Sequence, residues 1–218
     1  MNDKNNASGR FLNKLFGGLK MSWPAVILFA VGAAVLTAVF LIVPVFKNSS
    51  FERMGVYLEA WVLFAVIIMS NCKKPLESAL KTFVFFLVSQ PLIYLFQVPF
   101  SWLGWGIFSF YKTWLIWTVL TLPGAFVGWF ITKRNWLSVL ILSPVLAFLG
   151  YTLFDCASAC LTGFPQYLLA ALFCLAQIVL YIAAFLPKRA QKLVGALIPA
   201  AVVLALLLLK LSGSEFRL

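Results

Sequence analysis

The stretch WPAVILFAVGAAVLTAVFLIVPVF, residues 23–46, decides the fold, because it is apolar over a length that can cross a membrane. A helix needs about 20 such residues to cross ~30 Å of hydrocarbon. Only helices and closed barrels satisfy their backbone hydrogen bonds in lipid, and runs without polar alternation indicate helices. Six similar runs follow: Met54–Cys72, Ala79–Phe100, Thr113–Thr132, Trp136–Phe154, Pro165–Phe185 and Leu193–Leu211. The sequence therefore predicts an all-α, polytopic transmembrane bundle with seven spans.

The composition supports this class independently. Of the 218 residues, 63% are hydrophobic and 11% are charged, and the mean hydropathy is +1.02. A soluble domain has about 25% charged residues, so a soluble fold is excluded. The net charge of +11 would suggest nucleic acid for a soluble protein. Here the charges lie in short gaps between spans, so membrane topology explains them and no nucleic-acid partner is expected.

The basic residues predict the orientation. With the N-terminus in the cytoplasm, twelve of the 17 Lys and Arg residues fall in inner segments and five in outer ones. Cytoplasmic loops carry this excess in membrane proteins. Removing one span would destroy the alternation, so seven spans are favoured over six, with the C-terminus outside. The second span is the weakest prediction, since it is short and contains Glu59.

The predicted chain has three parts. Residues 1–22 form a basic cytoplasmic segment, in which 1–10 are polar and expected to be disordered and 11–21 are expected to lie on the inner leaflet. Residues 23–211 form a single transmembrane domain, and residues 212–218 form a short extracytoplasmic tail. The first apolar run exceeds the ~7–15 residues of a signal-peptide core, so it is interpreted as a retained span.

Small residues mark predicted helix contacts. Ala30, Ala34 and Ala38 form one stripe on the first span, and Gly124 and Gly128 form a GxxxG pair on the fourth. Small side chains let helices approach closely in lipid. The stripes indicate contacts within the chain, and docking of a partner membrane subunit against the first span is the alternative.

Histidine is absent from the chain, which excludes the common catalytic pairs and every histidine-ligated metal site. No nucleotide-binding glycine loop or paired-carboxylate motif is present either. We therefore expect no metal, no cofactor and no enzymatic activity. A membrane enzyme that uses only serine, lysine or aspartate is the remaining catalytic alternative.

The four cysteines fall into two groups. Cys72 and Cys174 lie in or at the end of spans, where cysteine usually acts as a small apolar residue. Cys156 and Cys160 lie in the predicted outer loop DCASACLTGFPQY, in an oxidising environment if the topology holds. A disulfide between these two and a pair of free thiols are both compatible with the sequence.

Polar groups inside the spans predict a pocket, because polar side chains in lipid usually face the bundle interior. Two acids are expected near the outer side, amides beneath them and aromatic residues above them. The third and sixth spans also share a Gln-x-x-x-Tyr pattern at mid-membrane. The candidate ligand or ion pocket comprises Glu59, Gln90, Tyr94, Gln97, Asp155, Gln177 and Tyr181. A structural role in helix–helix hydrogen bonding is the alternative for each.

The outer stretch VPFSWLGWGIFSFYKTWLIW, residues 98–117, is unusual because it is a predicted loop made mostly of aromatic residues. Tryptophan favours the membrane interface, so an interfacial belt or a helix lying on the membrane is one interpretation. The other is an aromatic lid or wall over a pocket open to the outside.

Two stretches resemble known families. Residues 70–100, SNCKKPLESALKTFVFFLVSQPLIYLFQVPF, resemble small multi-pass membrane proteins of Gram-positive bacteria that carry no assigned function, which implies a bacterial plasma membrane. The Ala30, Ala34 and Ala38 stripe is similar to the first span of the substrate-binding subunits of energy-coupling-factor vitamin transporters. Those subunits have six spans, whereas seven are predicted here.

The function that these features favour is transport or capture of a small molecule, with the chain acting alone or as the membrane subunit of a complex. A non-transporting accessory, immunity, assembly or sensor protein is the alternative. An outward cavity lined by the polar residues favours the former, and polar residues that all pair with one another favour the latter.

Overall fold

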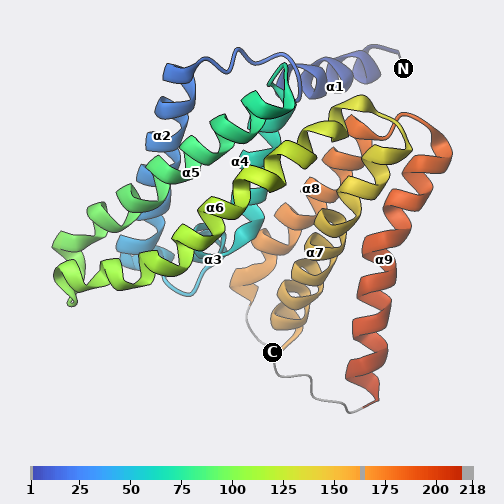
Figure 1. Ribbon diagram of the computed structural model, residues 1–218. Helices are drawn as coiled ribbons and strands as arrows, with labels where there is room; N and C mark the ends of the chain where they lie inside the picture. Colours follow the sequence, from blue (N-terminus) through green and yellow to red (C-terminus); the bar gives the residue numbers. More distant parts are fainter. Residues whose placement is uncertain (1, 163–164, 213–218) are drawn as a thin grey trace. The chain divides into compact units, whose positions relative to one another are not determined.

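The computed structural model describes residues 2–162 and 165–212, with side chains from residue 9 onward (Figure 1). The described residues form helices and short turns and contain no strand, which confirms the predicted all-α class. Six helices are long and apolar enough to cross a membrane, and the number is seven if one bent pair counts as a single span. The predicted tail lies outside the described residues beyond Ser212.

Contacts within the chain divide it into two compact units, Met1–Phe130 and Ile131–Leu218, so the predicted transmembrane domain contains a boundary near residue 130. Unit 1 contains α1 (Asn2–Leu15), α2 (Trp23–Ile42), η1 (Pro44–Phe46), α3 (Ser50–Val56), α4 (Leu58–Ser70), α5 (Pro75–Gln97), η2 (Val98–Phe100), η3 (Gly104–Phe110) and α6 (Tyr111–Gly128). A 3-10 turn, η4 (Trp129–Lys133), crosses the boundary. Unit 2 contains α7 (Trp136–Leu161), η5 (Pro165–Tyr167), α8 (Leu168–Phe185) and α9 (Arg189–Leu211).

The N-terminal segment differs from the prediction, because residues 2–15 form α1. The loop after α1 is held by Asn71, which follows α4. The Asn71 carboxamide oxygen accepts hydrogen bonds from the backbone N–H groups of Gly17 (3.0 Å) and Leu19 (2.7 Å), and its Nδ2 donates to the carbonyl of Leu15 (2.7 Å). The Asn71 side chain thus satisfies a carbonyl at the end of α1 and two N–H groups of the loop that follows.

Local sequence sets the helix ends. Ser22 caps α2, where its hydroxyl accepts from the Ala25 N–H, and Pro24 occupies the first turn. Pro44 ends α2, because the residue before a proline is driven to extended backbone, as Val43 is at ψ 120°. Asn135 and Ser138 form a reciprocal capping box at the start of α7.

The second predicted span is broken at Tyr57, where α3 and α4 meet at 60°. At ~1.5 Å per residue the 13 residues of α4 cover about 20 Å, which is less than the hydrocarbon core. The Trp61 indole N–H donates to the carbonyl of Gly55 at 3.2 Å, across the break. This bond satisfies a carbonyl that the interrupted helix cannot use, so the break is a supported feature of the fold.

The core of unit 1 combines a cluster of aromatic side chains with a row of small alanine side chains on α2. Phe29, Phe64 and Phe85 meet with ring centroids 5.1–5.9 Å apart, and Trp61 packs beside them. The stripe of Ala30, Ala34 and Ala38 is buried on the same face of α2, which packs against α5. This face of α2 is covered by the chain itself.

The two glycines of the GxxxG pair differ in their surroundings. Gly128 is buried, and a Cβ added there would lie 2.6 Å from the sulfur of Met69 on α4. Gly124 is exposed, and an added Cβ would meet no heavy atom within 4 Å. Gly128 therefore packs against α4, whereas Gly124 has open space beside it.

Unit 2 is built on α7, which packs against both α8 and α9. A Cβ at Gly150 would lie 2.9 Å from the Cα of Pro199, so α7 and α9 approach through a glycine and a proline. The helix α7 continues to Leu161, past the predicted end of the fifth span at Phe154. Asp155, Cys156 and Cys160 are thus helical residues and do not lie in a loop.

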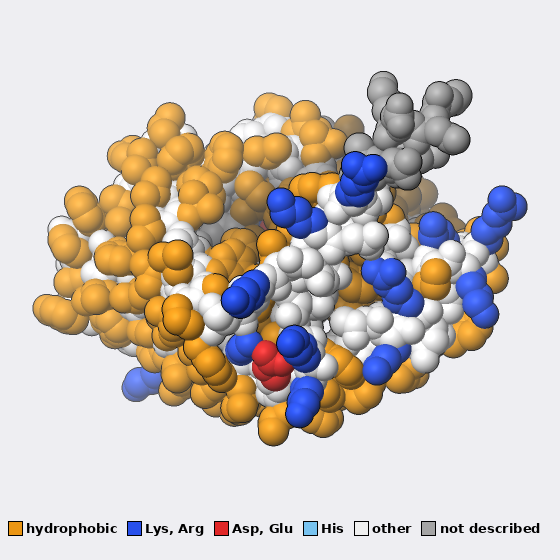
Figure 2. All heavy atoms as spheres, turned by 90° about the horizontal axis from the view of Figure 1, so that it is seen from above, with side chains coloured by type: hydrophobic (Ala, Val, Ile, Leu, Met, Phe, Trp, Pro, Cys, Tyr) orange, Lys and Arg blue, Asp and Glu red, His pale blue; other side chains and the backbone are white. Residues whose placement is uncertain are grey.

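Basic residues gather at one end of unit 1. The bonds of Asn71 to the loop after α1 and of Lys81 to Met21 bring together the start of α2, the end of α4 and the start of α5. Lys14, Lys20, Lys73 and Lys74 belong to these segments, and Lys and Arg side chains gather on the face seen in Figure 2. The chain thus leaves this end along α2 and has returned to it by the end of α4. In unit 2, basic residues precede α7 and occupy the turn between α8 and α9.

Candidate functional site

A cavity of about 450 Å³ lies in unit 1, between the last two turns of α5 and the aromatic segment that follows. Small-molecule sites usually have volumes of ~300–1,000 Å³. The α5 wall consists of Gln90, Ile93, Tyr94 and Gln97. The remaining lining consists of Ser101, Trp102, Leu103, Ile107, Phe110 and Trp114, with Leu41, Gly55 and Val56 from earlier in the chain. Three of the predicted pocket residues therefore share one cavity: Gln90, Tyr94 and Gln97.

Gln90 is the most informative residue of this cavity. It is 2% exposed, and its Nε2 makes no hydrogen bond within the described structure. Leaving a buried donor unsatisfied costs about 1–3 kcal/mol, so such groups are uncommon in proteins. Gln90 lines the cavity, and a rotation of its amide group would let this N–H donate to a molecule that enters.

Gln97 and Tyr94 are held by local contacts. The Nε2 of Gln97 donates to the carbonyl of Ile93 at 3.1 Å, one turn back on α5. The Tyr94 ring packs against Phe108 and Tyr111, with centroids 6.0 and 6.1 Å away. These contacts hold the side chains of Tyr94 and Gln97 in place on the cavity wall. One N–H of the Gln97 amide is used in the bond to Ile93.

The aromatic segment of residues 98–117 contains side chains that line the cavity and others that are highly exposed. Trp102, Phe110 and Trp114 line the cavity, as a wall would. Trp102 is also 92% exposed and Trp105 is 70% exposed, as residues of an interfacial belt would be. The segment turns at Gly104, whose φ of +51° lies in the left-handed region that glycine adopts without strain.

Glu59 does not line the cavity, although it was a leading candidate from the sequence. It is fully buried at the start of α4, and one of its carboxylate oxygens lies 3.7 Å from Nε of Arg53 on α3. The Arg53 guanidinium also lies 4.3 Å from the centroid of the Tyr57 ring. The carboxylate is placed at a helix N-terminus, where negative charge is favourable. Glu59 therefore belongs to an ion pair across the α3–α4 break.

The other predicted pocket residues lie in unit 2. Gln177 and Tyr181 are buried one turn apart on α8, and the Tyr181 hydroxyl donates to Oε1 of Gln177 at 2.8 Å. Gln90 and Tyr94 have the same spacing but show no such bond. The two Gln-x-x-x-Tyr pairs therefore differ: one is joined by a hydrogen bond, and the other lines the cavity. Asp155 is exposed on α7. The 450 Å³ cavity contains none of these three residues.

No disulfide joins Cys156 and Cys160 in the structure. The two residues are one turn apart on α7, where Cβ atoms are separated by about 5–6 Å. A disulfide needs Cβ atoms about 3.5–4.5 Å apart. The continued helix therefore explains why the two thiols are not bonded.

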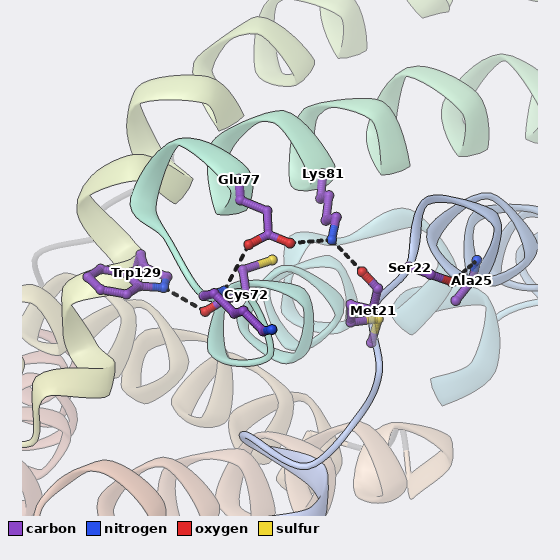
Figure 3. Close-up of polar contacts among 8 residues, drawn as sticks. Met21, Ser22, Ala25, Cys72, Glu77, Lys81 and Trp129 are labelled. Carbon is purple, nitrogen blue, oxygen red and sulfur yellow. Dashed lines mark hydrogen bonds and ion pairs between the residues drawn. The ribbon is translucent and has the colours of Figure 1, made fainter.

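A polar network at the basic end of unit 1 was not foreseen from the sequence (Figure 3). Lys81 is 5% exposed, and its ammonium donates to the carboxylate of Glu77 and to the carbonyl of Met21. Glu77 also accepts from the backbone N–H of Lys73. The Trp129 indole donates to the carbonyl of Cys72 at 2.8 Å. The network ties α5 to the loop before α2, and η4 to the loop before α5.

The Cys72 thiol lies beside this network in the α4–α5 loop. Burial, with a smaller contribution from the negative charge of Glu77, raises its pKa to about 11. The thiol is therefore neutral at physiological pH, as expected of a structural cysteine.

Two signals in the sequence could have revealed this network. Glu77 and Lys81 are spaced i, i+4, which places opposite charges on one helix face. Lys81 is also a charge inside an apolar run, and such residues usually have partners. The bond from Lys81 to Met21 had no local signal, since 60 residues separate them.

Comparison with known protein families, curated proteins and solved structures found no match. Among the described residues, no group of three or more Cys, Asp or Glu side chains is placed to hold a metal ion. The cavity of unit 1 is therefore the feature from which a function can be proposed.

Proposed function

We propose that this chain is a seven-span protein of a bacterial plasma membrane that captures or transports a small polar molecule through the cavity of unit 1. The N-terminus is cytoplasmic and the C-terminus is outside. The cavity lies at the end of unit 1 remote from the basic network, and in the proposed topology this end is the outer one. No charged side chain is among the residues that line it, so the molecule is neutral or zwitterionic.

The observation that carries the proposal is the buried, unsatisfied Nε2 of Gln90 on the cavity wall. An apolar residue of similar size would avoid the cost of this group, so the amide is kept for a reason other than stability. A ligand that accepts a hydrogen bond from Gln90 supplies that reason. The aromatic walls would bury the rest of a small molecule, as is usual in such sites.

The return of the chain to the basic end by the close of α4 supports counting α3 and α4 as one span. A span broken near the outer side also has precedent in transporters, where interrupted helices border substrate sites. Gly55 and Val56, at the end of α3, line the cavity. The break thus shapes the site as well as the topology.

A paired comparison of variants tests the proposal. Gln90→Leu should raise the melting temperature, because it removes an unsatisfied buried amide. Ser89→Ala is the matched control, since Ser89 also has a buried oxygen without a hydrogen-bond partner but does not line the cavity. A panel of neutral and zwitterionic compounds, including glycerol, monosaccharides and amino acids, is then screened for thermal stabilisation.

At least one compound of the panel should stabilise the wild type and Ser89→Ala but not Gln90→Leu. The proposal is contradicted if Gln90→Leu lowers the melting temperature and no compound distinguishes it from Ser89→Ala. That result would make Gln90 a structural residue.

A non-transporting accessory or sensor protein is the second candidate. The bond between Tyr181 and Gln177 and the pair of Arg53 with Glu59 favour it, because each joins two polar side chains of the protein, although Nε2 of Gln177 makes no hydrogen bond. Their arrangement needs no ligand. Gln90 has no such partner, and for this reason we favour a binding function.

A further inference from the structure

A second hollow in unit 1, of about 250 Å³, lies between α4, α5 and α6. Its lining is almost entirely apolar, and two threonines are the polar members. The lining residues are Leu58, Trp61, Val62, Ala65, Met69, Thr82, Phe86, Trp114, Trp117, Thr121, Gly124 and Ala125. We call this hollow the apolar groove.

The groove follows from the way α4 meets α6. The two helices touch where Gly128 packs on Met69, at the basic end of unit 1. One turn away, Gly124 has open space in place of a neighbour. Met69 and Gly124 both line the groove, so it lies beside this contact point. The short, bent α4 leaves this space unfilled.

Trp114 borders both the groove and the polar cavity, because it is among the lining residues of each. On one side of this residue are the amides of Gln90 and Gln97. On the other are Trp117 and the apolar faces of three helices. A polar compartment and an apolar one thus adjoin at a single residue, within helices that are apolar enough to cross a membrane.

We propose that the cavity and the groove together bind one single-chain amphiphile. Its neutral or zwitterionic head accepts a hydrogen bond from Gln90, and its hydrocarbon chain lies in the groove and passes Trp114. This inference rests on the proposed function of the cavity and adds the substrate class. Lipid is as apolar as the groove, so the chain gains close packing there, and the head supplies most of the selectivity.

The test uses a cysteine at Gln97, introduced after the four native cysteines are replaced, in full-length protein reconstituted in nanodiscs. A membrane-impermeant methanethiosulfonate reagent modifies this cysteine, and added compounds are scored by protection. Dodecanoylglycerol, a neutral amphiphile, is the probe, and glycerol is its head without the chain. Dodecanoylglycerol should protect at concentrations at least about tenfold lower than glycerol.

Gly124→Leu fills the groove and should raise the half-protecting concentration of dodecanoylglycerol about tenfold or more. Gly32→Leu is the matched control, since Gly32 on α2 is also exposed and without neighbours within 4 Å but lines neither site. The control variant should behave like the parent protein. Equal protection of the two variants, or equal potency of glycerol and dodecanoylglycerol, would overturn the amphiphile proposal.

A second measurement does not depend on the folding of Gly124→Leu. A monoacylglycerol brominated in its chain should quench tryptophan fluorescence in the native sequence. Trp117→Phe should reduce this quenching, and Trp105→Phe should not, because Trp105 lines neither site. Equal quenching in both variants would also overturn the proposal. If the cysteine at Gln97 does not react at all, the proposed function itself fails, and the two failures are thereby distinguished.

Discussion

Nε of Arg53 lies 3.7 Å from a carboxylate oxygen of Glu59, and the two residues come from opposite sides of the break between α3 and α4. The Arg53 side chain is 11% exposed and that of Glu59 is fully buried. Two buried charges on either side of a bend stabilise that bend only while both are present. The pair therefore explains the break more directly than it suggests a ligand site.

Glu59→Gln should destabilise the protein, because it leaves the charge of Arg53 buried without its counter-charge. Loss of one partner of a buried pair typically costs about 3–5 kcal/mol. The double variant Arg53→Met with Glu59→Gln should recover part of that loss, and Lys47→Gln, at an exposed position, should change little. The melting temperatures of the wild type, Glu59→Gln, the double variant and Lys47→Gln measure these differences in stability. An unchanged melting temperature for Glu59→Gln would show that the carboxylate has no structural role.

Lys81→Met should weaken the connection between α5 and the loop before α2. The substitution removes the donor to the Met21 carbonyl and to Glu77, and loss of such bonds costs about 1–3 kcal/mol. Lys74→Met is the control, since Lys74 is exposed. Limited proteolysis in the segment of residues 16–22 should become faster in Lys81→Met only. Equal rates in both variants would contradict a structural role for this lysine.

Cysteine alkylation tests the thiols directly. Without reductant, Cys156 and Cys160 should retain the mass of free thiols, and a mass lower by two hydrogens would show a disulfide. Cys72 should react slowly at neutral pH, because its pKa is raised to about 11 and the thiolate is the reactive form. Its alkylation rate should rise about tenfold per pH unit up to that pKa. A rate that levels off near pH 8 would contradict the burial of Cys72.

The membrane topology can be checked with single cysteines. Labels near Lys74, Lys133 and Arg189 should react only from the cytoplasmic side, and a label at Ser212 should react only from outside. A cytoplasmic Ser212 would mean an even number of spans. That result would contradict the proposed topology.

The sequence predicted the apolar helices well, because length and hydropathy are decided locally. Two of the helix ends were predicted wrongly. The first run was expected to continue to Phe46 and the third to begin at Ala79, whereas α2 ends before Pro44 and α5 begins at Pro75, as the backbone preferences of proline favour. The break at Tyr57 could be suspected only from the short second span, since the bond from Trp61 to Gly55 that supports it is a tertiary contact. Likewise, nothing in the sequence separated Gln90, which lines a cavity, from Gln177, which pairs with Tyr181. The two residues differ only in what packs around them.

Whether the cavity of unit 1 opens to the outer side can be tested by comparing two positions on α5 in the cysteine-free protein. Gln97 lines the cavity, whereas Leu95, two residues away, is 43% exposed on the helix surface that faces lipid in our account. A membrane-impermeant thiol reagent added from outside should modify a cysteine at Gln97 rapidly and one at Leu95 slowly or not at all. Equal reactivity at the two positions, or reaction at Gln97 only from the cytoplasmic side, would contradict an outward-facing cavity.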